Sequence, residues 1–386
     1  MTLRRQFRVL RHRAGRWAGG RRWLASISLL AAMGITTALL VLVVSENAVN
    51  STGAPTKAAA PSTAKKGVEP KNGVTTTTPT TPTTPTTKPV GQTVPLGVYA
   101  GPGAPVAATA FSADAGAPVP YAFDYIDGST WQSISDPMWF LRRWNGSNFR
   151  MIWGVEMLPA TGATLAAGST GAYDAYFSQL AYTFVQNGQA SSVIMLGWDP
   201  EDPTLPWAAT SETAATEYVS YWRQIVTSMR SVPGEQFQFA WDSAAGSDPV
   251  LPPALYPGNG YVDIVATDAF DVGTPVTSSG WGAYAAEPYG PDWFSTFANS
   301  HHKQLMIAKW GLAPRGDSGG GDNPTYVSQF LRWADGRHLF AAITWDYGSW
   351  AVTGGSFPKA AAELHTVAEA GAVVPIAKVV DSSDSH

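Results

Sequence analysis

The chain has 386 residues, of which 45% are hydrophobic and 14% charged, so it is long enough to bury a large core in one domain with extensions. Cysteine is absent, which excludes disulfides, thiolate metal sites and a cysteine nucleophile. Eight arginines lie before residue 23, and the rest of the chain holds 17 basic against 29 acidic residues. A surface that binds nucleic acid would be basic, so this balance disfavours nucleic acid and favours a neutral ligand.

The N-terminal segment has the pattern of a membrane anchor. Residues 1–22 carry the eight arginines and no acid, and Trp23 to Val44 follow without a charge. A helix of that length rises about 33 Å at ~1.5 Å per residue, enough for a bilayer core of ~30 Å. The arginines predict a cytoplasmic N-terminus, and therefore a single-pass protein of the cell membrane whose C-terminal domain is extracytoplasmic. A cleavable signal peptide is the alternative, although its apolar region is normally shorter.

Residues 45–94 are rich in Thr, Pro and Ala and include the run TTTTPTTPTTPTTKP. This composition cannot bury enough apolar surface to fold, so it predicts a disordered stalk. The folded domain is expected over residues 95–373, and residues 374–386 are expected to form a disordered tail.

Short apolar runs alternate with helical stretches in the folded part, a pattern typical of repeated βα units. Eight strands are predicted, and five helices lie between or after them. The strands are Leu96–Ala100, Tyr121–Ile126, Phe149–Met157, Ser192–Asp199, Gln236–Asp242, Val262–Phe270, Gln304–Leu312 and Phe340–Tyr347. The helices are Tyr173–Gln186, Glu212–Arg230, Asp292–His301, Tyr326–Asp335 and Lys359–Ala370. Eight strands predict a (β/α)8 TIM barrel, and a doubly wound open sheet is the alternative.

The predicted strand ends are rich in aromatic and acidic residues, and the strand ends are where such barrels place their active sites. Tryptophan beside a carboxylate predicts a groove with stacking faces and hydrogen-bonding groups, which suits a neutral polysaccharide. The candidate substrate-binding residues are Trp198, Trp207, Trp310, Trp345 and Tyr347.

Two segments carry a family resemblance. The sequence GWDPEDPTLPW from Gly197 to Trp207 and the sequence IAKWGLAPRGDSGGGDNPTYVSQFLRW from Ile307 to Trp333 resemble signature regions of actinobacterial glycoside hydrolases similar to the family 26 β-mannanases. The resemblance extends over about Gly97 to Ala370. It implies a retaining mechanism, in which one Glu after strand four protonates the leaving oxygen and one Glu on strand seven attacks the sugar.

Both of these catalytic positions differ here. Asp199 stands where the resemblance implies the strand-four Glu, and Lys309 stands where it implies the strand-seven Glu. An ammonium group cannot form the glycosyl ester that double displacement needs. The sequence therefore predicts a pseudoenzyme in which Lys309 and Asp199 form a salt bridge across the former site.

Three other residues or roles would still permit catalysis. Glu201 is a second candidate acid, and Asp346 is a candidate for a relocated second carboxylate in a retaining or inverting reaction. Lys309 is a candidate Schiff-base nucleophile. The closely spaced acids Asp199, Glu201 and Asp202 are a weak candidate for calcium, because the Gly and the closing Glu of the common calcium loop are missing. No metal or other cofactor is predicted.

Three functions are compatible with these residues. The first is a membrane-tethered, catalytically impaired glycoside-hydrolase-like protein that binds β-linked polysaccharide of the mannan or glucan type. The second is an active endo-β-glycosidase that uses Asp199 or Glu201 with a relocated carboxylate. The third is a structural or interaction protein of the cell envelope.

Overall fold

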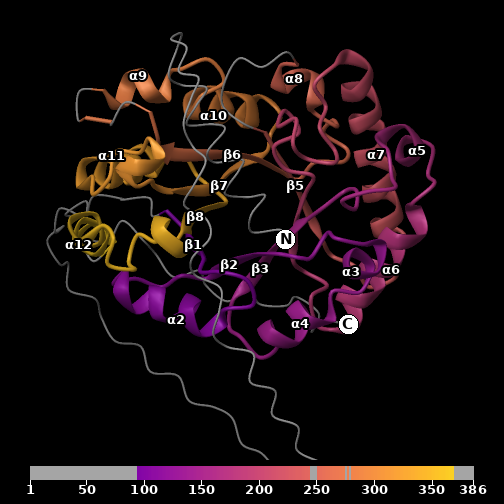
Figure 1. Cartoon of the computed structure of the whole chain (residues 1–386), viewed down its shortest axis with the longest axis horizontal. Helices are drawn as coiled ribbons and strands as arrows, with labels where there is room; N and C mark the ends of the chain where they lie inside the picture. The colour runs from indigo at the N-terminus through magenta and orange to yellow at the C-terminus, as the bar shows by residue number, and fades with distance from the viewer. Residues whose placement is uncertain (1–93, 244–249, 274–275, 278–279, 369–386) are drawn as a thin grey trace, which may run out of the picture. The chain divides into compact units, whose positions relative to one another are not determined.

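A computed structural model describes residues 94–368, apart from 244–249, 274–275 and 278–279. Eight parallel strands form a closed barrel in chain order, with helices around it (Figure 1). The strands are β1 (Leu96–Tyr99), β2 (Tyr121–Tyr125), β3 (Arg150–Val155), β4 (Val193–Leu196), β5 (Gln238–Asp242), β6 (Ile264–Asp271), β7 (Gln304–Leu312) and β8 (Ala341–Trp345).

The barrel closes through β1 and β8, which pair in parallel from Leu96 with Ala342 to Tyr99 with Trp345. All eight predicted strands are present, with bounds within a few residues of those expected, and the TIM-barrel prediction is confirmed. The alternative of an open, doubly wound sheet is wrong, because its strand order would leave two edges instead of a closed ring.

The helices and short helical turns follow the strands in turn. They are α2 (Pro105–Asp114), α3 (Trp131–Ser135), α4 (Met138–Trp144), α5 (Leu165–Ser169), α6 (Asp174–Gln186), α7 (Glu212–Arg230), α8 (Pro252–Leu255), α9 (Trp281–Ala285), α10 (Pro291–Ser300), α11 (Pro324–Ala334) and α12 (Pro358–Val367), with 3-10 turns at Arg315–Asp317 and Gly348–Trp350. The five predicted helices correspond to α6, α7, α10, α11 and α12.

The additional helices are short or weakly amphipathic, so their periodicity gave little signal. In α2, for example, only Ala108 and Phe111 are buried along the helix. By contrast, α7 begins at an N-cap, where the side chain of Ser211 accepts a hydrogen bond from the Ala214 backbone N–H. Its buried residues recur at helical spacing and lie on the barrel side.

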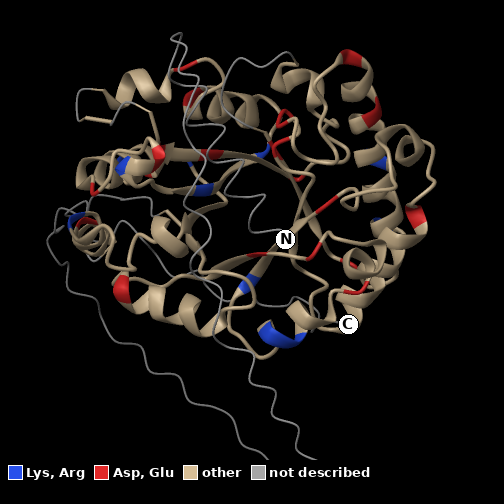
Figure 2. Ribbon diagram, in the orientation of Figure 1, with Lys and Arg blue, Asp and Glu red and all other residues tan. Residues whose placement is uncertain are grey.

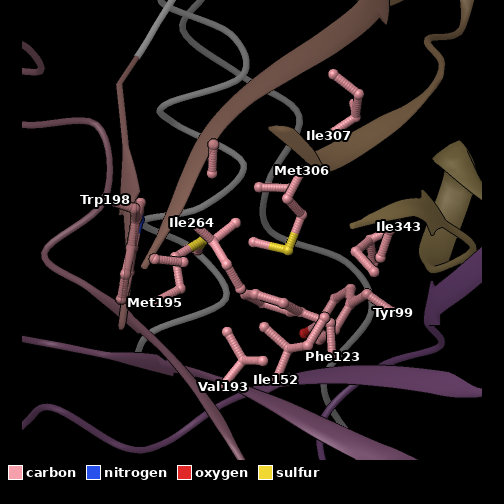
Figure 3. Packing of buried hydrophobic residues seen from close by; sticks show 14 of the residues in the cluster. Tyr99, Phe123, Ile152, Val193, Met195, Trp198, Ile264, Met306, Ile307 and Ile343 are labelled. Atoms are coloured by element: carbon pink, nitrogen blue, oxygen red, sulfur yellow. The ribbon is translucent and has the colours of Figure 1, made fainter. Parts of the chain in front are cut away.

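The interior of the barrel is filled by apolar side chains from several strands. Figure 3 shows Met195 from β4 and Met306 from β7 in this packing, near Phe123 of β2 and Ile264 of β6. All four side chains are fully buried or nearly so. The interior is therefore a packed core and not a pore.

The predicted membrane span at Trp23–Val44, the stalk and the C-terminal tail lie outside the described residues. Within residues 94–368, no helix combines the length and the apolar character that crossing a bilayer requires.

Candidate functional site

A β-bulge in β7 determines where Lys309 points. Ile307 is opposite Thr267 of β6 and Ala342 of β8, yet Lys309 is opposite Asp268 and Trp310 is opposite Thr344. Relative to both neighbours, β7 therefore has one extra residue between Ile307 and Trp310. A bulge re-aims the side chains that follow it. Here Lys309 enters the barrel, while Trp310 stacks on Phe330 of α11 with ring centroids 4.4 Å apart.

Lys309 is the cation of a buried ionic cluster at the carboxyl ends of the strands. Its Nζ lies 3.0 Å from Asp268 Oδ2, 3.4 Å from Asp199 Oδ2 and 3.6 Å from Asp242 Oδ2. The cluster is nearly inaccessible to solvent, since Lys309 is 4% exposed and Asp268, the most exposed of the three acids, is 5% exposed. The predicted salt bridge between Lys309 and Asp199 is thus confirmed. We name this set of Asp199, Asp242, Asp268 and Lys309 the lysine cluster.

Asp242 and Asp268 were not among the site residues predicted from the sequence. A signal was available, because alternate residues of a strand share a face. Asp268 lies four residues after Ile264 on β6 and so shares its face, and Ile264 points into the barrel core (Figure 3). Asp242 is the last residue of β5, and its carboxylate contacts Lys309 Nζ. Both carboxylates therefore point inward at the level of Lys309.

The charge state of the cluster follows from two opposing effects. Burial by itself would lower the pKa of Lys309, but the carboxylates of Asp199, Asp268 and Asp242 raise it well above its ordinary value. Burial also raises the pKa of the neighbouring Tyr125 hydroxyl. Lys309 is therefore an ammonium ion at neutral pH and lacks the free amine that a Schiff-base nucleophile needs.

The three carboxylates form a group with metal-like spacing. One oxygen from each of Asp199, Asp242 and Asp268 lies within 4.8 Å of the others. Among the described residues, this is the one group of three or more acidic or imidazole side chains with such spacing, and it does not include Glu201 or Asp202. The Lys309 ammonium group supplies a positive charge to this group of carboxylates.

The loop after β4 holds Asp199 in an unusual backbone conformation. Asp199 has φ 48°, in the left-handed region that few non-glycine residues adopt. Three aromatic side chains anchor the adjoining backbone from outside the barrel. Trp222 Nε1 donates to Leu196 O at 3.1 Å, the Tyr218 hydroxyl donates to Gly197 O at 2.9 Å, and Trp207 Nε1 donates to Trp198 O at 2.7 Å. These bonds fix the direction of the Asp199 side chain.

The other two candidate acids have different surroundings. Glu201 is 5% exposed and lies in the same loop, but it makes no ion pair with Lys309. Asp346, just after β8, accepts hydrogen bonds at 2.7 Å from both the backbone N–H and the hydroxyl of Thr353. Burial raises the pKa of Asp346, and the bonds from Thr353 oppose this rise. Asp346 thus orders the turn after β8 and is not one of the ion-pair partners of Lys309.

Most of the predicted sugar-stacking residues are core residues. Trp207 and Trp310 are 0% exposed, Trp345 is 1% exposed and Trp198 is 3% exposed. Trp198 is enclosed by edge-to-face contacts with Tyr125 and Trp207, at 4.8 and 4.9 Å between centroids. Among the five candidates only Tyr347 is partly exposed. The four tryptophans therefore offer no free ring face in this structure, since they are packed against the barrel and its helices.

The fold resembles that of solved mannanases. Structures similar to this chain include the YdhT protein of Bacillus subtilis (TM-score 0.52, 15% identity, covering 70% of this chain and 85% of that one). The mannanase man26 of Bacillus subtilis has a TM-score of 0.51 at 15% identity and the same coverage. A modular endo-β-1,4-mannanase from Cellulomonas fimi, of glycoside hydrolase family 26, has a TM-score of 0.53 at 14% identity, covering 71% of this chain and 70% of that one. At this identity the likeness establishes a common barrel fold alone.

No protein-family model matches the sequence, and no curated protein matches it significantly.

Proposed function

We propose that this chain is a glycoside-hydrolase-like protein that binds β-linked polysaccharide of the mannan or glucan type without hydrolysing it by double displacement. The similarity to family 26 mannanases supports the ligand class. The lysine cluster supports the loss of hydrolysis, and it is the observation that carries the proposal.

The chemistry of the lysine cluster opposes a retaining reaction. A retaining glycosidase needs two carboxyl groups about 5 to 5.5 Å apart, one acting as nucleophile. In this chain the β7 position is an ammonium ion, and Asp199 is ion-paired to it. Proton donation by Asp199 would break that ion pair inside a buried site, and an ammonium ion would repel a cationic transition state.

A direct test uses the purified full chain with soluble galactomannan and mixed-linkage β-glucan. We expect slower migration in native gels that contain the polysaccharide, and no release of reducing ends. Reducing ends that Asp199→Asn abolishes would instead support the active endo-β-glycosidase. Neither binding nor hydrolysis would support the structural cell-envelope protein.

The active-enzyme alternative has less structural support. It requires Asp199 or Glu201 to work with a second carboxylate, and Asp346 was the candidate. The carboxylate of Asp346 is bonded to Thr353, and Asp199 is bonded to Lys309. Each group is thus engaged in a separate structural interaction.

We also propose that the barrel is tethered outside the cell membrane by a helix at residues 23–44. The support is the uncharged stretch of 22 residues that follows the arginine-rich N-terminus. Protease added to intact cells should remove the barrel while a cytoplasmic marker survives. A barrel that resists digestion while a known external protein is cleaved would contradict this orientation.

A further inference from the structure

One large hydrophobic side chain outside the lysine cluster is both exposed and held in place. Trp139 of α4 is 57% exposed. Its ring packs on Gly103, which follows β1, so closely that a Cβ added to Gly103 would lie 2.6 Å from the ring. The Arg143 guanidinium lies over the same ring, 5.9 Å from the centroid. The ring is therefore positioned by its neighbours even though much of its surface faces solvent.

The backbone under this ring is fixed on both sides. Arg143 Nε donates to Gly103 O at 2.9 Å. The Gly103 backbone N–H donates to Asp124 Oδ2 at 2.7 Å, and Trp144 Nε1 donates to the same oxygen at 2.7 Å. Asp124 is fully buried. This network connects the Gly103 backbone, on which the Trp139 ring packs, to Asp124 of β2.

Arg143 also lines a surface groove of about 620 Å³. It lies between α2 and the end of α4. Hydroxyl and amide groups line it together with apolar surface, for example Asn145, Asn148 and Phe149. None of its lining residues is acidic, and Figure 2 shows basic but no acidic colour on α4.

We infer that the groove between α2 and α4, together with the Trp139 ring that contacts its lining residue Arg143, binds a chain of neutral sugars. This inference rests on the proposed function and assigns its binding surface to the flank of the barrel instead of the strand ends. A sugar ring presents an apolar face that stacks on an aromatic ring, and its hydroxyls match amide and hydroxyl partners. Arg143 is the one charged residue in the lining, and the other lining side chains are uncharged, so the groove offers a polyanion a single cationic partner but offers a neutral sugar chain several hydroxyl and amide partners.

The test compares variants of the full chain by affinity electrophoresis with galactomannan, mixed-linkage β-glucan and the acidic polymer polygalacturonate. Trp139→Ala should weaken binding to the neutral polysaccharide about ten-fold, because it removes the exposed aromatic face on which a sugar ring stacks. Trp139→Phe, which keeps an aromatic face, should retain most of the binding. Tyr182→Ala, at a 53% exposed position on α6, is the matched control and should bind like the parent.

The outcomes separate the two proposals. If the parent binds a neutral polysaccharide and Trp139→Ala binds it equally well, the groove assignment is wrong while the proposed function stands. If the parent binds none of the polymers, the proposed function fails and the groove assignment fails with it. Preference for polygalacturonate would overturn the neutral-ligand argument. Circular dichroism and thermal melting establish that each variant is folded.

Discussion

Lys309 stabilises the barrel only as long as its three partners are present. Buried ions lose their hydration, and the loss is offset when oppositely charged groups lie within contact distance. Three carboxylates lie within 3.6 Å of Lys309 Nζ. The stability of the fold is therefore sensitive to any substitution that removes the Lys309 ammonium group, even one by an uncharged side chain of similar size.

We expect Lys309→Met to lower the free energy of unfolding by about 3 to 5 kcal/mol, because it leaves carboxylates buried without their cation. Urea denaturation of parent and variant measures the difference. Lys303→Met is the control, since Lys303 has an exposed hydrogen bond to Asn259 O and no ion pair. It should change stability by less than about 0.5 kcal/mol. Equal effects of the two substitutions would contradict the role given to the lysine cluster.

The same electrostatics limits the introduction of a pair of catalytic glutamates at positions 199 and 309. Asp199→Glu with Lys309→Glu would introduce two glutamates, but it would bring four carboxylates together and remove the Lys309 ammonium group. We expect this double variant to be unfolded. Adding Asp242→Asn and Asp268→Asn removes two of the negative charges and should recover a cooperative thermal transition. A double variant that melts cooperatively near the parent temperature would show that repulsion among the four carboxylates is too weak to unfold the barrel.

Asp124 makes stability depend on pH. Burial raises its pKa from 3.8 to about 7, and hydrogen bonds from Trp144, Gly103 and Tyr125 only partly oppose the rise. Because the folded chain holds this proton more tightly, the associated stability is fully present below pH 3.8 and is lost as the pH rises through about 7. The slope per group is at most about 1.4 kcal/mol per pH unit.

We therefore expect the parent to lose stability relative to Asp124→Asn as the pH rises from 4 to 7. Urea denaturation at several pH values measures this difference, and subtracting the two curves removes the contributions of the other acids. A constant difference across that range would show that Asp124 is ionised in the folded chain throughout.

At the scale of elements, the loop after β4 is positioned from outside the barrel by α7 and Trp207. Trp207→Phe preserves most of the ring packing but leaves the buried carbonyl of Trp198 without its 2.7 Å donor. We expect a loss of about 1 to 3 kcal/mol in the free energy of unfolding. Trp139→Phe is the matched control, because that ring is largely exposed, and it should have little effect. Equal losses would mean that ring volume, and not the hydrogen bond, decides the cost.

The strands could be predicted from sequence because each is a short apolar run ended by turn residues. Lys309 and Asp199 could be predicted as site residues because they occupy the positions where the family resemblance implies two glutamates. The bulge in β7 could not be predicted, since no residue in Ile307–Trp310 signals an extra register position. Without it, strand alternation does not distinguish an inward Lys309 from an inward Trp310. The burial of Trp198 was also missed, because a tryptophan at a strand end has the same sequence pattern in a groove and in a core.

At the scale of the whole molecule, the barrel holds all eight strands between Leu96 and Trp345. We expect residues 91–373 alone to fold with a cooperative thermal transition, because this span contains every described strand and helix of the closed barrel. Residues 91–337, which lack β8 and α12, should aggregate because β1 and β7 would become open edges. A soluble, cooperatively folded 91–337 fragment would show that closure is dispensable.

The pairing of β1 with β8 also determines the point during synthesis at which the barrel can close. Leu96 is made early, but its partner Ala342 emerges only after the seven other strands. Until then the nascent chain is a growing parallel sheet with two unpaired edges, and such long-range pairing is intrinsically slow. If the chain crosses a membrane during synthesis, its most vulnerable interval ends only when β8 has crossed. A chaperone that shields strand edges on the far side would then raise the yield of this protein more than one that acts before export.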